Sequence, residues 1–216
     1  MKQLLIILSF VSLSAFANGS KEKEEIDPFV IEQEEIINQA LLKLRSAEDD
    51  NMRMMANADL IDALEPVLKH PDAMRYSFSK LETMSTITSP DGAFRIFNWN
   101  VENDNMVHSH FCYLIRPKRS GKDNQVIELK EDKVTISRKP EQMLTALNWY
   151  GAIYYNIVPV KRGRQTYYTV MGYDGNDRST NMKILDVFYF KGKTLRMGHP
   201  MFQESPSSPN YLRRVF

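Results

Sequence analysis

Cysteine is almost absent from this sequence of 216 residues, which contains only Cys112. A single cysteine excludes an intrachain disulfide. The surrounding stretch HSHFCYLIRP is largely apolar, so we expect the thiol to be buried and to pack as a small hydrophobic group. A nucleophilic role would require an activating partner, and no Cys–His signature is present.

An excess of charge of either sign is also missing. The chain has 28 Lys and Arg residues against 27 Asp and Glu residues, so we expect no bulk attraction to nucleic acid. Catalytic motifs are missing as well: there is no G-x-S-x-G, no H-E-x-x-H and no glycine-rich phosphate loop. These absences favour a protein that binds a partner without catalysis over an enzyme.

No apolar run reaches the length of about 20 residues that a transmembrane helix needs. The longest run, at residues 4–16, follows Lys2 and ends at Ala15-Phe16-Ala17, which is the pattern of a secretory signal peptide covering residues 1–17. We therefore predict export to the periplasm or the extracellular space, with no transmembrane span after cleavage. Residues 18–26 are polar and highly charged, which is typical of a flexible leader.

Residues 27–82 show helical periodicity. Asp27-Pro28 is a strong helix start, and apolar residues recur at helical spacing up to Leu44. A second helix is predicted over residues 58–70 and is ended by Pro71, and a short third helix is predicted over residues 72–81.

Residues 83–216 consist of short strand-like runs separated by short turns, which is typical of antiparallel meanders. A short helix is predicted after Pro140. The run ILDVFYF is apolar on both faces, so we expect it in the middle of a sheet under a second layer. The predicted fold class is α+β, with N-terminal helices packed on an antiparallel, aromatic-rich β-meander that forms a curled sheet or a sandwich.

Several stretches of the β domain resemble a family of uncharacterised exported bacterial proteins. They are SPDGAFRIFNWN, WYGAIYY, YYTVMGYDGNDRSTNMKILDVFYF and MGHPMF. Members share an aromatic-Asp-Gly-Asn loop between two apolar strands. The resemblance covers residues 84–202, implies a similar fold and export, and supplies no catalytic residues. Because members continue past the point that corresponds to residue 216, it also implies that the β domain is C-terminally incomplete here.

Two groups of residues are candidate metal ligands. His108 and His110 are two residues apart, so on a strand both project to one face, as a pair of zinc ligands would. The loop DGND offers Asp174 and Asp177 for calcium, although Arg178 occupies a position where an EF-hand loop needs a ligand. Zinc or calcium is thus the alternative cofactor, and a metal-assisted hydrolase that uses these four residues is the alternative function. The competing interpretation of DGND is a turn.

Met52, Met54 and Met55 form a dense cluster of thioethers, which are ligands that Cu(I) prefers. Methionine also fills gaps where helices meet, and we expect packing to be the role of these three side chains.

Two turns are basic, and their cations are candidate ligands for an anion. The first turn contains Arg116, Lys118 and Arg119, and the second contains Lys161, Arg162 and Arg164. If both turns lie at the same end of the sheet, they could bind an anionic glycan, an anionic lipid headgroup or another envelope protein. The sequence thus predicts an exported, non-catalytic binding or interaction protein of the cell envelope.

Overall fold

The structure is a computed structural model that describes residues 25–132, 142–203, 205–207 and 212–215. The predicted signal peptide, most of the predicted leader and residues 133–141 of the predicted β domain lie outside the described residues. Within the described ranges, no helix combines the length and the apolar character that crossing a membrane requires.

Two long helices open the described chain, α1 (Pro28–Arg45) and α2 (Asp50–Lys69). Each begins at a capping aspartate, because the Asp27 side chain accepts a hydrogen bond from the Phe29 N–H and the Asp49 side chain accepts one from the Met52 N–H. The second helix starts eight residues earlier than its periodicity indicated. The predicted third helix is reduced to a 3-10 turn, η1 (Pro71–Met74).

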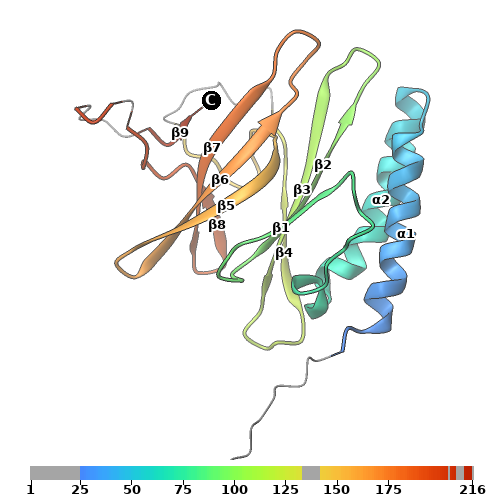
Figure 1. The fold of residues 1–216 in the computed structure, drawn as a ribbon, viewed down its shortest axis with the longest axis horizontal. Helices are drawn as coiled ribbons and strands as arrows, with labels where there is room; N and C mark the ends of the chain where they lie inside the picture. The colour runs from blue at the N-terminus through green and yellow to red at the C-terminus, as the bar shows by residue number, and fades with distance from the viewer. Residues whose placement is uncertain (1–24, 133–141, 204, 208–211, 216) are drawn as a thin grey trace, which may run out of the picture.

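Within the described residues, nine strands follow in two antiparallel sheets (Figure 1), which confirms the predicted α+β class. Sheet 1 has the order β1 (Ser85–Thr88), β2 (Arg95–Glu102), β3 (His108–Pro117) and β4 (Asn124–Leu129). Sheet 2 has the order β5 (Ile153–Arg162), β6 (Gln165–Asp174), β7 (Met182–Lys191) and β8 (Thr194–Met197), and β9 (Arg214–Val215) pairs with β7.

The elements form three layers, with sheet 1 between the helices and sheet 2 (Figure 1). Strands of sheet 1 are therefore buried on both faces. On β2, Ile96 packs against sheet 2, whereas Phe97 and Trp99 pack against the helices. The helices thus cover sheet 1. The apolar strand β7, which we expected to lie under a second layer, packs against sheet 1.

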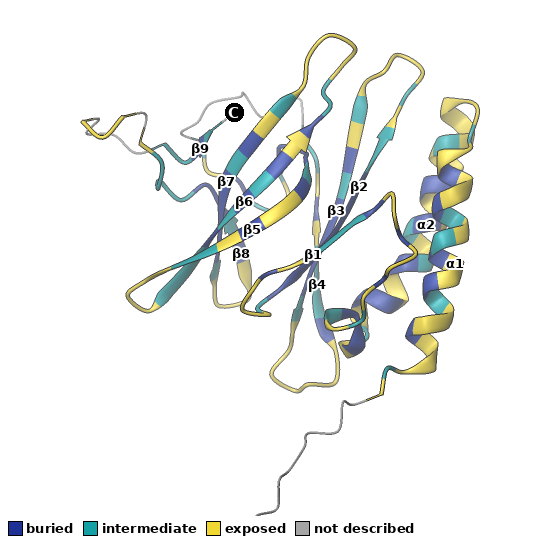
Figure 2. Ribbon diagram, in the orientation of Figure 1, coloured by how far each residue is buried: buried dark blue, intermediate teal, exposed yellow. Residues whose placement is uncertain are grey.

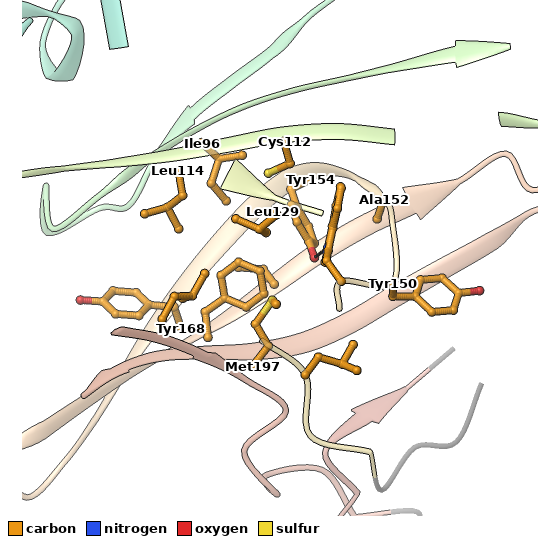
Figure 3. Packing of buried hydrophobic residues seen from close by; sticks show 14 of the residues in the cluster. Ile96, Cys112, Leu114, Leu129, Tyr150, Ala152, Tyr154, Tyr168 and Met197 are labelled. Atoms are coloured by element: carbon orange, nitrogen blue, oxygen red, sulfur yellow. Dashed lines mark hydrogen bonds between the residues drawn. The ribbon is translucent and has the colours of Figure 1, made fainter. Parts of the chain in front are cut away.

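The core between the sheets is rich in aromatic rings (Figure 3). Phe188 of β7 contacts the Tyr154 ring of β5 edge to face, with 5.3 Å between the ring centroids. Cys112 lies in this core, and its burial raises the pKa of the thiol well above its usual range. This confirms the prediction that the cysteine packs as a hydrophobic group.

The segment after Pro140 is not helical where it is described. Leu144 pairs with Met197 of β8 through two backbone hydrogen bonds of 3.1 Å each, and residues 145–148 form a turn. This pairing buries Leu144 completely, so the gain from tertiary burial outweighs the local helical pattern.

Arg95 connects sheet 1 to the chain that follows the helices. Its guanidinium donates hydrogen bonds to the carbonyl oxygens of Ala73, Tyr76 and Ser77. It also lies over the rings of Phe78 and Phe97, about 5 Å from each centroid. Burial lowers the pKa of Arg95 to about 10.

We predict that Arg95→Met lowers the free energy of unfolding by about 2–4 kcal/mol, because three carbonyl groups lose their charged donor. Urea denaturation measures the change. Arg164→Met, in an exposed turn, is the matched control and should stay within about 0.5 kcal/mol of the parent. Equal effects of the two substitutions would contradict the assigned role of Arg95.

Candidate functional site

A buried histidine lies between carboxylates of both sheets. His110 is on β3, on the face toward sheet 2, and its side chain is 0% exposed. Its Nδ1 atom is 2.7 Å from Oε1 of Glu131, and its backbone N–H donates to Oε2 of the same carboxylate. Its Nε2 atom has no hydrogen-bond partner and lies 3.5 Å from Oδ1 of Asp174, at the end of β6. The cluster therefore lies where the two sheets meet.

Two glycines leave room for side chains in this region, namely the Glu131 carboxylate and the His108 imidazole. A Cβ atom on Gly151, whose φ is +90°, would lie 2.0 Å from Oε1 of Glu131. A Cβ atom on Gly175 would lie 2.6 Å from the His108 ring. Larger residues at these positions would displace the Glu131 carboxylate or the His108 imidazole.

The structure brings together only part of the predicted metal site. His108 turns its Nδ1 atom to the Asn100 amide, 2.7 Å away, and its ring centroid is 6.4 Å from that of His110. Asp177 is exposed. Among the residues that the structure describes, no group of three or more His, Cys, Asp or Glu side chains is arranged to hold a metal ion. The predicted set is thus reduced to the pair His110 and Asp174.

The loop DGND has the hydrogen bonds of a turn, which confirms that interpretation. Oδ1 of Asp174 accepts from the Asn176 N–H, and Oδ1 of Asp177 accepts from the N–H groups of Ser179 and Thr180. Asn176 adopts a φ of 52°, in the left-handed region that asparagine tolerates. Both carboxylates are therefore used within the loop.

The methionine cluster is exposed, so the prediction that these side chains fill a helix interface is wrong. Met52, Met54 and Met55 are 52%, 69% and 68% exposed. The reason is the helical phase of α2, because its buried stripe passes through Ala56, Leu60 and Leu64.

A pocket of about 670 Å³ lies between the β3–β4 turn and the β7–β8 turn, at the edge of both sheets. This volume is in the range of ligand sites, about 300–1,000 Å³. Its lining contains four cationic side chains and no acidic one. The lining residues are Arg116, Pro117, Lys118, Arg119, Ser120, Gln125, Gly192 and Lys193.

The wall of the pocket is fixed by contacts between the sheets. The Arg116 guanidinium lies 4.1 Å from the centroid of the Phe190 ring and donates to the Gly192 carbonyl. The Gln125 amide donates to the Lys193 carbonyl at 2.9 Å. Burial lowers the pKa of Arg116, which still keeps its positive charge at neutral pH. The pocket therefore has one positioned guanidinium and three cations on exposed side chains.

Three of the cations in this lining, Arg116, Lys118 and Arg119, are the candidate anion ligands of the first basic turn. The second basic turn, with Lys161, Arg162 and Arg164, lies at the same end of the sandwich but does not line the pocket (Figure 1). Lys193 was missed, although the sequence KGK at residues 191–193 is itself a readable basic turn.

The net charge of the chain is close to zero, but the charges are unevenly distributed along it. Residues 25–82 contain thirteen acidic and six basic side chains, whereas residues 83–216 contain twelve acidic and nineteen basic ones. The β part of the protein is therefore basic.

No protein-family model, no curated protein and no solved structure matches this chain. The resemblance to an exported bacterial family thus stays a prediction.

A further polar contact links the two sheets at the pocket end. The Tyr168 hydroxyl of β6 donates to Oδ2 of Asp91, in the turn between β1 and β2. Partial burial by itself raises the pKa of Asp91, but hydrogen bonds from Ser89, Tyr168 and the Ala93 N–H outweigh it and hold this pKa below its usual range. Burial, followed by the bond to Asp91, raises the pKa of Tyr168 well above its usual range.

We predict that Glu131→Ala lowers the free energy of unfolding by about 2–4 kcal/mol, because the N–H groups of His110 lose a buried charged acceptor. Guanidinium denaturation measures the loss. The control Glu128→Ala removes an exposed carboxylate from the neighbouring strand β4 and should change stability by about 0.5 kcal/mol or less. A loss below about 1 kcal/mol for Glu131→Ala would contradict a structural role for the cluster.

We predict that the stabilising effect of Asp91 disappears in acid. Its pKa is lower in the folded than in the unfolded chain, so its contribution is complete above the unfolded pKa and is lost as the pH falls through the folded pKa. The difference in unfolding free energy between the parent and Asp91→Asn should therefore be larger at about pH 6 than at about pH 3. Urea titrations at the two pH values measure it, and a difference independent of pH would refute the coupling.

Proposed function

We propose that this protein is a non-catalytic binding protein whose ligand carries a phosphate or a similar oxyanion. The observation that carries the proposal is the pocket between the β3–β4 and β7–β8 turns, with four cationic side chains and no acidic one in its lining. Charge-assisted hydrogen bonds from Arg and Lys are the strong contacts by which proteins hold such anions.

Arg116 is suited to the role of anchor. Its contacts with Phe190 and with the Gly192 carbonyl restrict the guanidinium before a ligand arrives, so less conformational entropy is lost on binding. Lys118, Arg119 and Lys193 surround it on exposed stems and can close on an anion from two turns. Because these turns belong to different sheets, a bound anion would bridge sheet 1 and sheet 2.

The exported location, predicted from the first 17 residues, is part of the proposal. A binding protein of the cell envelope would meet anionic groups on lipids and glycans there. The alternative of a metal-assisted hydrolase has only the pair His110 and Asp174 in its favour within the described residues. We therefore do not propose it.

We predict that the protein binds inorganic phosphate or glycerol 3-phosphate and that Lys193→Met weakens this binding about tenfold or more. A hydrogen bond to a charged group contributes about 1.5–3 kcal/mol, and the substitution removes one. Isothermal titration calorimetry measures the affinity.

The matched control is Lys183→Met, which removes an exposed lysine from the far end of β7, the strand that leads into the turn of Lys193. It should leave the affinity unchanged. If the parent binds neither phosphate compound, or if the two variants lose affinity equally, the proposed pocket is not the ligand site.

A further inference from the structure

The antiparallel topology collects the basic turns at one end of the molecule. In sheet 2 the β5–β6 and β7–β8 turns must share an end, because the strands alternate in direction. The pocket places the β3–β4 turn of sheet 1 beside the β7–β8 turn. All three turns lie at the lower end of the view in Figure 1, opposite the β2–β3 and β6–β7 turns.

This basic end, defined by residues 116–123, 161–165 and 191–194, has a pronounced excess of positive charge. Its acidic side chain is Asp123, which pairs with Lys118 at 3.6 Å. All of its cations except Arg116 are exposed, as the colour of the turns in Figure 2 shows. The cations are Arg116, Lys118, Arg119, Lys122, Lys161, Arg162, Arg164, Lys191 and Lys193.

Acidic groups near this end have partners within the protein. Asp91 accepts hydrogen bonds from Ser89 and Tyr168. In the helical layer, Asp72 pairs with Arg75 at 2.7 Å. The cations of the basic end are therefore not neutralised by these neighbouring carboxylates.

A small anion in the pocket accounts for only part of this charge. Lys161, Arg162 and Arg164 do not line the pocket, so a ligand confined to it would leave the β5–β6 turn without a counter-charge. An extended anionic surface would contact all three turns at once. The turns contain no aromatic residue, whereas single-stranded nucleic acids are bound through base stacking on aromatic side chains.

We propose that the basic end docks on a bilayer of anionic phospholipid, with one phosphate headgroup in the pocket and the β5–β6 turn on neighbouring headgroups. This inference rests on the proposed function for the headgroup in the pocket. Attraction between the surrounding cations and the bilayer would add to the affinity of the pocket for one headgroup. Each Lys or Arg near an anionic membrane strengthens binding about fivefold. Salt weakens the attraction, because the Debye length at physiological ionic strength is only about 8 Å.

The test compares the full chain and two double variants on vesicles of phosphatidylcholine with and without phosphatidylglycerol, by co-sedimentation. Vesicles of phosphatidylcholine alone correct for apolar binding by the N-terminal residues. Lys161→Ser/Arg164→Ser removes two charges from the β5–β6 turn and leaves the pocket intact. Arg178→Ser/Lys183→Ser removes two exposed charges from the opposite end and is the matched control.

We expect the β5–β6 variant to bind phosphatidylglycerol vesicles roughly 30-fold more weakly than the parent, about fivefold for each charge, and the control to bind like the parent. The β5–β6 variant should keep the affinity of the parent for glycerol 3-phosphate, since that ligand occupies the pocket alone. A parent that does not prefer phosphatidylglycerol vesicles, or equal losses in the two variants, would overturn the docking.

Two further outcomes separate this inference from the proposed function. If glycerol 3-phosphate does not bind but vesicle binding still depends on Lys161 and Arg164, the pocket assignment is wrong and the docking end stands. If the parent binds a phosphate-free acidic polysaccharide such as polygalacturonate more tightly than vesicles, the assigned surface is wrong although the pocket remains basic.

Discussion

Burial of sheet 1 on both of its faces is the constraint on which the rest of this structure depends. Alternate residues of β2 and β3 enter two different cores, one shared with the helices and one shared with sheet 2. A shift of one residue in register would exchange these two sets of side chains and misplace every contact. The helices and sheet 2 are therefore held in place by the same strands, and the two ends of the sandwich are defined by how those strands turn.

Polar groups in the cores strengthen this constraint, because each of them has its partner only in the observed register. The Asn98 amide donates to the Ala152 carbonyl across the sheets, and the Trp99 indole donates to Asn57 of α2. Asp186 and Arg214 form a buried ion pair that attaches β9 to the core. Breaking any of these contacts would leave a buried polar group unpaired, which costs more free energy than the bond itself contributes.

The functional proposals follow from the two ends of the sandwich. At one end, His110 of β3 lies buried between Glu131 and Asp174, and the Glu131 carboxylate is used in bonding the histidine. At the other end, three turns present nine cationic side chains against one acidic side chain, Asp123. A site that holds an external ligand needs groups that the fold has not already satisfied, and the basic end has them.

Local chemistry in the sequence was sufficient to predict the α+β class, the strands and the turns. Asp27-Pro28 starts a helix, alternating residues form strands, and Asp174 and Asp177 form a turn because their short side chains bond the adjacent backbone. Tertiary structure alone decided the rest. Leu144 lies in a helical sequence pattern but pairs with Met197, and the helices cover sheet 1 rather than β7. Glu131 bonds His110, and Lys193 lines a pocket with residues of the β3–β4 turn, which are distant in the chain. The physical reason is that burial and charge pairing depend on which surfaces meet, and sequence spacing fixes a residue's face without fixing the surface opposite it.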